Sequence, residues 1–132
     1  MQGLLQLLGR LLFAVPFLVF GVGHFQKASQ MTGIVPSWLP EAQTWVYVTG
    51  ASLVAAGIAI VLRRFDRVAA FLLAVLLLAF VVTVHLPSWL GQAASDPAQA
   101  ALLKNMAFAA MLKDTGLAGA ALLVASGPRR KG

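Results

Sequence analysis

The sequence predicts an all-α membrane protein built as a four-helix transmembrane bundle. Of its 132 residues, 60% are hydrophobic and 11% are charged, whereas soluble domains average about 45–50% apolar and about 25% charged residues. Mean hydropathy is +0.86. A soluble fold of this length has too little interior to hide so much apolar surface from water. We therefore expect one transmembrane domain over residues 1–132, solvated by the lipid bilayer, and not a freely soluble enzyme.

Four apolar segments are long enough to cross a bilayer, whose hydrocarbon core of about 30 Å requires about 20 helical residues. The predicted spans are residues 4–25, 43–62, 67–86 and 98–126. The first span contains Arg10 and Pro16, and its apolar opening residues argue against a cleaved signal peptide. The last span is interrupted by charge at Lys113 and Asp114.

Basic residues predict the orientation of these spans. Six of the ten Lys and Arg lie in the loop between the second and third spans and in the C-terminal tail: Arg63, Arg64, Arg67, Arg129, Arg130 and Lys131. Positively charged loops stay in the cytoplasm, so we expect an up-and-down bundle with both termini inside, multi-pass in the bacterial inner (plasma) membrane. No basic stripe interleaves with aromatic residues, so we expect no nucleic-acid partner despite the net charge of +6.

A four-residue repeat marks the two loops predicted to face outward. The segments 36–39 and 87–90 both read Pro-Ser-Trp-Leu, and each follows a span that ends in histidine. Proline ends helices and tryptophan prefers the headgroup region, so the repeat fits interfacial chemistry. It also fits an old duplication of a helical hairpin. On either interpretation we expect the third span to end before Pro87.

Charged residues inside the spans are candidates for function. Arg10 lies roughly 9 Å deep at about 1.5 Å per residue, and we expect its long side chain to snorkel to the interface. Lys113 and Asp114 are adjacent and point about 100° apart, so we expect no pair between them. Asp114 belongs to a stripe of small residues, which predicts that it faces another helix and finds its partner there. The stripe comprises Ala107, Ala110, Ala118, Ala121 and Ala125.

Two histidines are the candidate partners of Asp114. His24 and His85 end the first and third spans, on the same side of the membrane as Asp114. In an up-and-down bundle the fourth helix contacts both the first and the third. The expected cluster beneath the outer face consists of His24, His85, Lys113 and Asp114, roofed by Trp38 and Trp89. Taken singly, each histidine also fits an interfacial residue bonded to backbone or water.

An imidazole and a carboxylate beside water suit proton transfer to a quinone or to a small polar substrate. Haem held by two histidines is a poor alternative, because His24 lies at the very end of its helix. We find no two-metal carboxylate pattern and no nucleophile beside a base, and the chain has no cysteine. We therefore expect no metal site, and the pattern identifies no catalytic residue.

Three motifs follow one another along the chain. They are an Arg-led span over residues 9–27 that closes in Gly-x-x-His-Phe, then His85-Leu-Pro87, then a Leu-Lys-Asp run followed by small residues over 111–121. In this order they resemble the DoxX family of small four-helix bacterial membrane proteins. That family has no agreed catalytic motif, so the resemblance carries over only to the matched polar positions: Arg10, His24, His85, Lys113 and Asp114.

The resemblance implies quinone chemistry, because DoxX-like proteins are linked to thiosulfate:quinone oxidoreduction, quinol oxidase complexes and redox-stress assemblies. We expect a redox-linked subunit with a quinone-type or small-molecule site near the outer face, working with a partner redox subunit. The chain has no cysteine, which argues against a thiol relay in this protein. The alternative is a non-catalytic scaffold that recruits a partner through the cationic loop 63–67. Small residues at Ala51, Ala55 and Ala59 permit close packing within the bundle or in a homo-oligomer.

Overall fold

A computed structural model of the chain describes residues 1–91 and 97–127, and every regular element within these ranges is a helix. The long elements are α1 (Gln2–Gln26), α3 (Ala42–Leu62), α4 (Asp66–Phe80) and α6 (Pro97–Ser126). The short elements are α2 (Ala28–Met31), the 3₁₀ turn η1 (Thr32–Ile34), the π-helical segment η2 (Val81–His85) and α5 (Leu86–Trp89).

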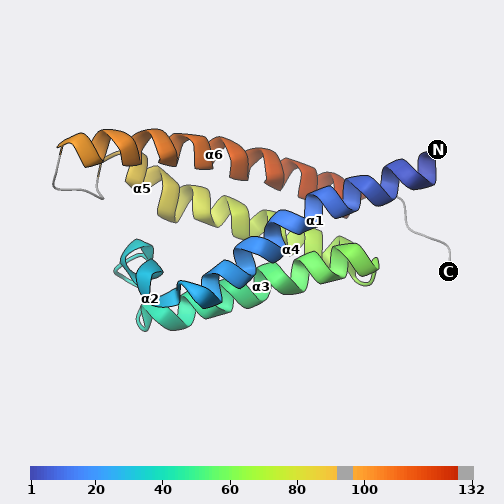
Figure 1. Ribbon diagram of the computed structural model, residues 1–132, viewed down its shortest axis with the longest axis horizontal. Helices are drawn as coiled ribbons and strands as arrows, with labels where there is room; N and C mark the ends of the chain where they lie inside the picture. Colours follow the sequence, from blue (N-terminus) through green and yellow to red (C-terminus); the bar gives the residue numbers. More distant parts are fainter. Residues whose placement is uncertain (92–96, 128–132) are drawn as a thin grey trace.

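Four helical rods are long and apolar enough to cross a membrane: Gln2–Gln26, Ala42–Leu62, Asp66–Trp89 and Ala100–Ser126. Consecutive rods run in opposite directions and lie side by side (Figure 1). This confirms the all-α, four-helix, multi-pass bundle predicted from the sequence. α1 begins and α6 ends at the same end of the bundle as the α3–α4 loop, whereas α2 and η1 fold over the opposite end (Figure 1).

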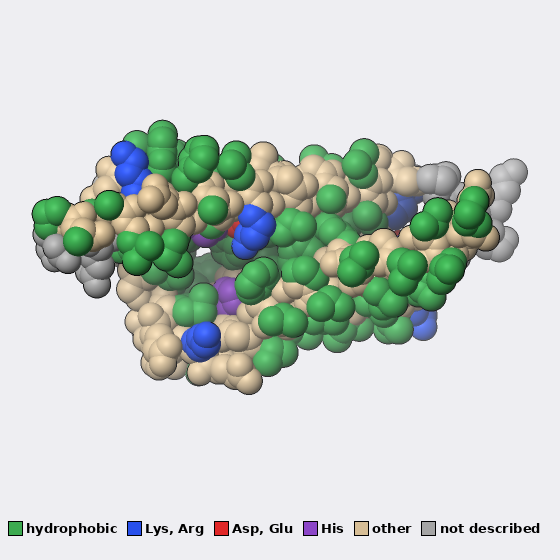
Figure 2. Space-filling view, turned by 45° about the horizontal axis from the view of Figure 1, so that its top comes forward, with side chains coloured by type: hydrophobic (Ala, Val, Ile, Leu, Met, Phe, Trp, Pro, Cys, Tyr) green, Lys and Arg blue, Asp and Glu red, His purple; other side chains and the backbone are tan. Residues whose placement is uncertain are grey.

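All four rods contribute to the core. The most buried large side chains, Phe17, Ile60 and Leu73, come from α1, α3 and α4, and Ala118 and Ala121 of α6 complete the same cluster. Packing is closest within two pairs, α1 with α3 and α4 with α6. The sequence predicted that α6 also packs closely against α1. In the structure the backbones of α1 and α6 lie farther apart than in either close pair, and the two helices meet through their side chains. Much of the remaining apolar surface is exposed, as lipid contact requires (Figure 2).

Two glycines allow α1 and α3 to approach each other closely. A Cβ atom placed on Gly21 would lie 2.6 Å from Val54 Cγ2 and 2.8 Å from the carbonyl oxygen of Gly50. A Cβ atom placed on Gly50 would lie 2.8 Å from the Cβ of His24 and 2.9 Å from the carbonyl oxygen of Gly21. A side chain at either position would meet backbone that cannot move aside. Small residues at such crossings are what let membrane helices pack closely.

The third rod continues past the point where the sequence predicted its end. Pro87 lies in the first turn of α5, and the helix runs on to Trp89. A proline ring clashes with the carbonyl four residues earlier in a regular α-helix, and the π-helical segment directly before Pro87 changes that spacing. The two Pro-Ser-Trp-Leu segments therefore differ in structure, because residues 87–89 are helical whereas residues 36–39 form turns and bends.

Arg10 joins three rods through its guanidinium group. Its guanidinium donates to Asp66 Oδ2 at 2.8 Å and to the carbonyl oxygen of Ile60 at 3.2 Å. The two charged side chains are each 21% exposed. Asp66 begins α4 and Ile60 lies in the last turn of α3, so one side chain of α1 binds both sides of the α3–α4 loop.

We expect Gly21→Ala to destabilise the bundle by about 1–3 kcal/mol, as overpacked cores do. Gly23→Ala on the same helix is the matched control, because a Cβ atom there meets nothing within 4 Å and alanine favours a helix by up to about 1 kcal/mol. Thermal unfolding in detergent, followed by tryptophan fluorescence, should give a lower midpoint only for Gly21→Ala. Equal midpoints for the two variants would contradict the close approach.

Breaking the Arg10–Asp66 pair should cost about 1–2 kcal/mol, between the values typical of exposed and of fully buried ion pairs. Arg10→Gln and Asp66→Asn each remove one charge, and the combined variant completes a double-mutant cycle. We expect a coupling free energy of about 1 kcal/mol, because the two side chains touch. Strictly additive losses of unfolding free energy would mean that the pair contributes nothing.

Candidate functional site

Asp114 is the buried charged residue around which the candidate site is built. It lies midway along α6 and is 3% exposed. His85 Nε2–H donates to its Oδ2 at 2.9 Å, and Lys113 Nζ lies 3.1 Å from its Oδ1. A charge at the membrane centre costs about 2.5–3.5 kcal/mol on insertion scales, and a charge-assisted hydrogen bond contributes about 1.5–3 kcal/mol. Two such contacts are enough to hold the carboxylate inside the bundle, against the partner helix that the sequence predicted.

Lys113 contacts its neighbour Asp114, so the prediction that these two residues do not pair is wrong. Their Cβ atoms diverge, but the four-carbon stem of lysine lets the ammonium curl back over the helix. The same Nζ atom lies 4.6 Å from the centre of the Phe20 ring on α1. This distance is within the range of a cation–π contact. Lys113 therefore links α6 to α1 while its side chain stays 46% exposed.

The π-helical segment determines where His85 lies. His85 is the last residue of η2, and a π turn inserts one residue relative to the regular α-helical register. Two hydroxyls bond to carbonyls along this stretch: Thr83 Oγ1 donates to Ala79 at 2.7 Å, and Ser88 Oγ donates to Val84 at 2.8 Å. π segments often coincide with functional sites. Spacing on an ideal helix would have placed the imidazole on a different face.

The His85–Asp114 pair lines a cavity of about 170 Å³. The polar part of its wall is made by His24, His85, Lys113 and Asp114, and the rest is apolar, including Phe17, Phe20, Leu53, Leu77, Phe80 and Leu117. The four polar residues grouped by the sequence analysis thus line one cavity between α1, the third rod and α6. Histidine side chains show in a hollow of the molecule beside a Lys or Arg side chain (Figure 2).

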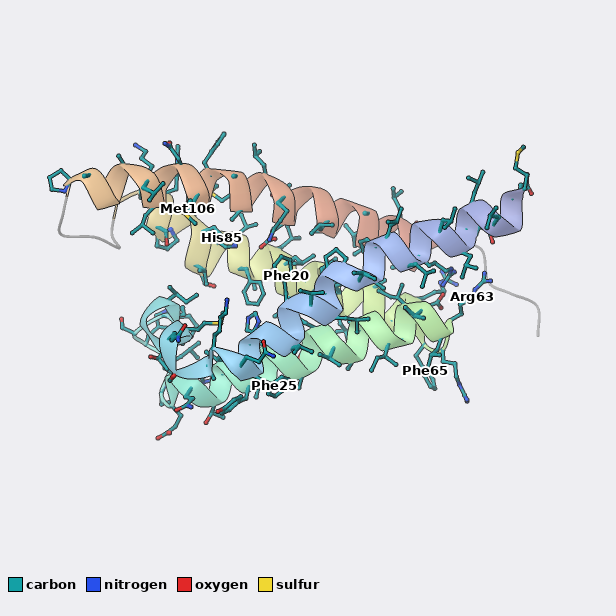
Figure 3. The ribbon with its side chains drawn as sticks, in the orientation of Figure 1. Phe20, Phe25, Arg63, Phe65, His85 and Met106 are labelled. Atoms are coloured by element: carbon teal, nitrogen blue, oxygen red, sulfur yellow. The ribbon has the colours of Figure 1, made fainter. Side chains whose placement is uncertain are left out.

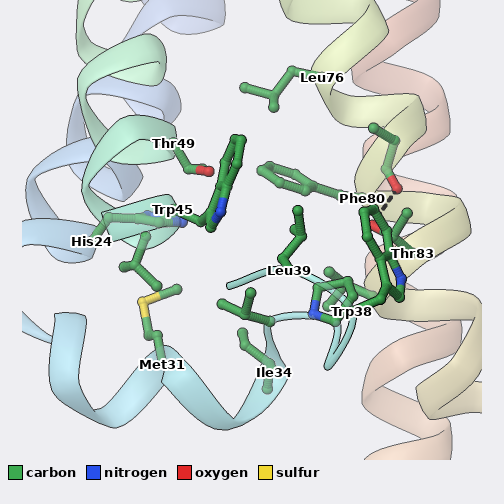
Figure 4. Close-up of a pocket in the computed structure, with 15 residues that line it drawn as sticks. His24, Met31, Ile34, Trp38, Leu39, Trp45, Thr49, Leu76, Phe80 and Thr83 are labelled. Carbon is green, nitrogen blue, oxygen red and sulfur yellow. Dashed lines mark hydrogen bonds between the residues drawn. The ribbon is translucent and has the colours of Figure 1, made fainter. Parts of the chain in front are cut away.

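A second cavity, of about 250 Å³, adjoins the first. The two cavities share His24, Met31, Ile34, Phe80 and Val84 as wall residues. Trp45 and Phe80 face each other across the larger cavity, with Met31, Ile34 and Leu39 on one side of it (Figure 4). Its walls are almost wholly apolar. The two spaces therefore combine a polar end at Asp114 with a larger apolar end under α2 and η1.

His24 lines both cavities but makes no contact with Asp114 in the structure. Its Nδ1–H donates to the carbonyl oxygen of Phe20 at 2.7 Å. Because a carbonyl only accepts hydrogen bonds, this contact places a proton on Nδ1. His24 is thus held by its own helix, and His85 is the histidine paired with the carboxylate.

The two tryptophans predicted to form a roof lie in different places. Trp38 lines the larger cavity. Trp89 lines neither of these cavities and instead packs on Phe108, with ring centres 6.3 Å apart, and lies 5.8 Å from Lys104 Nζ. The cause is the continuation of the third rod past Pro87, which places Trp89 on the helix surface that faces α6.

Sequence reasoning missed the apolar half of the site. Trp45 and Phe80 belong to spans whose aromatic residues resemble ordinary lipid-facing side chains, and the short segments α2 and η1 lie in a stretch predicted only as a loop. The one available signal was the unusual length of that loop, which also contains Trp38 and several apolar residues. Nothing in the pattern indicated that it folds back over the helices.

The polar side chains of this cavity are chemically able to exchange protons. Asp114 orients the His85 imidazole, which can take up or release a proton. The Lys113 ammonium can stabilise negative charge nearby. Within residues 1–91 and 97–127, no group of three His, Asp or Glu side chains is placed to hold a metal ion.

Comparison with known proteins gives a family but no characterised relative. No curated protein and no solved structure matches the chain. Residues 13–125 match the family described as "Domain of unknown function (DUF8561)", and this range contains the residues that line both cavities. The chain therefore belongs to the DUF8561 family.

Proposed function

We propose that this protein is a redox-linked subunit of the bacterial inner membrane that binds a quinone-type molecule near the outer face and exchanges protons with it. The observation that carries the proposal is the His85–Asp114 pair in the wall of an apolar cavity, with Lys113 beside it. The DoxX-like motifs support the same chemistry, because that family is linked to quinone reactions.

The polar end of the site suits the head group of such a ligand. A quinone carbonyl accepts a hydrogen bond, and a quinol hydroxyl donates one. Because Asp114 occupies the Nε2 side of His85, the other ring nitrogen is left to exchange a proton with the head group. The Lys113 ammonium, 3.1 Å from Asp114 Oδ1, would stabilise the anion that forms when reduction precedes protonation.

The apolar end suits the tail. The larger cavity adds about 250 Å³ next to the polar one, and His24 and Phe80 belong to both walls. A ligand with a flat polar head and an isoprenoid tail buries both parts of itself in such a paired space. A small polar substrate would leave the Trp45 side of the site unfilled.

The chain has no cysteine, so we propose that electrons reach the ligand from a partner redox subunit. The protein itself would bind the ligand, hold it against His85 and manage the proton. Because the protein would carry no electrons itself, a non-catalytic scaffold is the competing function. Only the scaffold function predicts that the two cavities bind no redox ligand.

A short-chain quinone should stabilise the wild-type protein against heat, and Asp114→Asn should lose most of that effect. At a ligand concentration about 100 times Kd, binding adds about 2.7 kcal/mol to the unfolding free energy. Asparagine keeps a hydrogen-bond acceptor for His85 but removes the negative charge that orients and stabilises its protonated imidazole. We therefore expect the apparent Kd to rise at least tenfold, which corresponds to about 1.4 kcal/mol of binding free energy. The measurement is the thermal midpoint in detergent across a quinone titration.

Asp66→Asn is the control for this experiment. It also removes a carboxylate from an ion pair, but Asp66 lines neither of the two cavities. It should lower the starting midpoint and keep the full ligand-induced shift. A wild-type protein that gains no stability from ubiquinone-type or menaquinone-type ligands would refute the quinone proposal and leave the scaffold as the better one.

Impermeant thiol labelling tests the orientation on which the outer-face site depends. The chain has no native cysteine, so single cysteines report without background. Ser37 and Arg64 are both exposed, at opposite ends of the bundle. In intact cells Ser37→Cys should react and Arg64→Cys should react only after permeabilisation. The reverse pattern would place the site at the cytoplasmic face.

A further inference from the structure

An apolar groove of about 670 Å³ runs along the outside of the bundle between α3 and α4. The α3 wall is made of small residues, including Ala55 and Ala59, whereas α4 contributes larger ones such as Val68 and Leu72. Ala55 is exposed and Leu72 is 59% exposed, so the groove opens to the surroundings of the bundle. The Ala51–Ala59 spacing noted in the sequence therefore does not form the main helix contact. Part of it forms the wall of this groove.

The length of the groove matches one leaflet of a bilayer. On α4 it extends from Val68, beside the α3–α4 loop, to Ala79, a distance of roughly 17 Å at about 1.5 Å per residue. Half of a hydrocarbon core about 30 Å thick is about 15 Å. A groove of this length and polarity fits one acyl chain lying along the helices.

Positive charge lies next to one end of the groove, in the loop between α3 and α4 that contains the groove residue Phe65. Arg63 and Arg64 are exposed and form no ion pair within residues 1–91 and 97–127. Among the described residues at this end, two further arginines are engaged, because Arg10 binds Asp66 and Arg67 Nε donates to the carbonyl oxygen of Ala125 at 2.8 Å. The unpaired charges thus lie where a lipid head group would meet the protein.

The backbone conformation of the loop places Phe65 at the end of the groove. Arg63 and Phe65 both adopt left-handed backbone conformations, with φ of 58° and 56°, which residues with a side chain rarely adopt. Phe65 is 81% exposed, yet it lines the end of the groove. Figure 3 shows Arg63 and Phe65 together at this end of the bundle. An aromatic ring flanked by arginines is typical of the membrane interface.

We propose that this groove is a binding site for an anionic phospholipid. One acyl chain lies between α3 and α4, and Arg63 and Arg64 bind the phosphate, which guanidinium groups match in charge and geometry. The site is separate from the His85–Asp114 cavity, and the proposal does not depend on quinone binding.

Lipid selectivity of the full chain tests the proposal. We expect the detergent-purified protein to retain dioleoyl phosphatidylglycerol at least tenfold better than dioleoyl phosphatidylcholine, measured by native mass spectrometry across a lipid titration. The double variant R63Q/R64Q should bind both lipids equally. The control K27Q/K104Q removes the same charge from the opposite end of the bundle and should keep the preference. An unchanged preference in R63Q/R64Q overturns the proposal.

Two further arms identify the occupant. Ala55→Leu fills the exposed groove without entering the core and should reduce retention of phosphatidylglycerol at least fivefold, with an unchanged thermal midpoint. Inorganic phosphate at millimolar concentration should not displace the lipid, because it lacks the acyl chain; displacement would mean a simple anion site. If the wild-type protein is a dimer that Ala55→Leu converts to monomers, a second copy covers the groove and the lipid proposal is wrong.

Discussion

In hydrocarbon, an apolar side chain gains little by moving from lipid into a protein core, and this constraint explains how the bundle is held together. Helices then associate through close packing and through polar contacts that lipid cannot provide. This protein uses both. Gly21 and Gly50 bring α1 against α3, and polar side chains join the rods at two levels. One level is Arg10 with Asp66, and the other is Asp114 with His85 and Lys113.

The two polar clusters use similar chemistry in different surroundings. The Arg10 guanidinium is shared between a carboxylate and the carbonyl oxygen at the end of α3, so its donors are used to close one end of the bundle. Asp114 is buried in the bundle, and its cluster borders a cavity. A buried ion pair beside an apolar space costs stability, so a purely structural role explains it poorly. The Arg10–Asp66 pair borders neither cavity. We therefore assign function to the Asp114 cluster and not to the Arg10 cluster.

Departures from regular helix structure create the space for that site. The π-helical segment shifts His85 toward Asp114, and α2 with η1 covers the neighbouring cavity. Both departures occur at the end of the bundle away from the α3–α4 loop (Figure 1). Toward the loop end, small side chains of α3 opposite larger ones of α4 leave a groove on the outer surface of the bundle. The molecule thus has a cavity with a polar wall at one end and, toward the other end, an apolar groove beside a cationic loop.

The sequence by itself determined the fold class, the number of spans and the inward direction of Asp114, because apolar length and small-residue periodicity act locally along a helix. Only the tertiary structure decided which polar groups meet. Asp66 lies 56 residues from Arg10, and the reach of Lys113 back to Asp114 depends on rotamers that helix geometry does not restrict. The extension of the third rod to Trp89 and the position of His85 follow from one π turn, which no periodicity reveals. Contacts between distant residues and changes of helical register arise from packing, and packing is settled only when all four rods are in place.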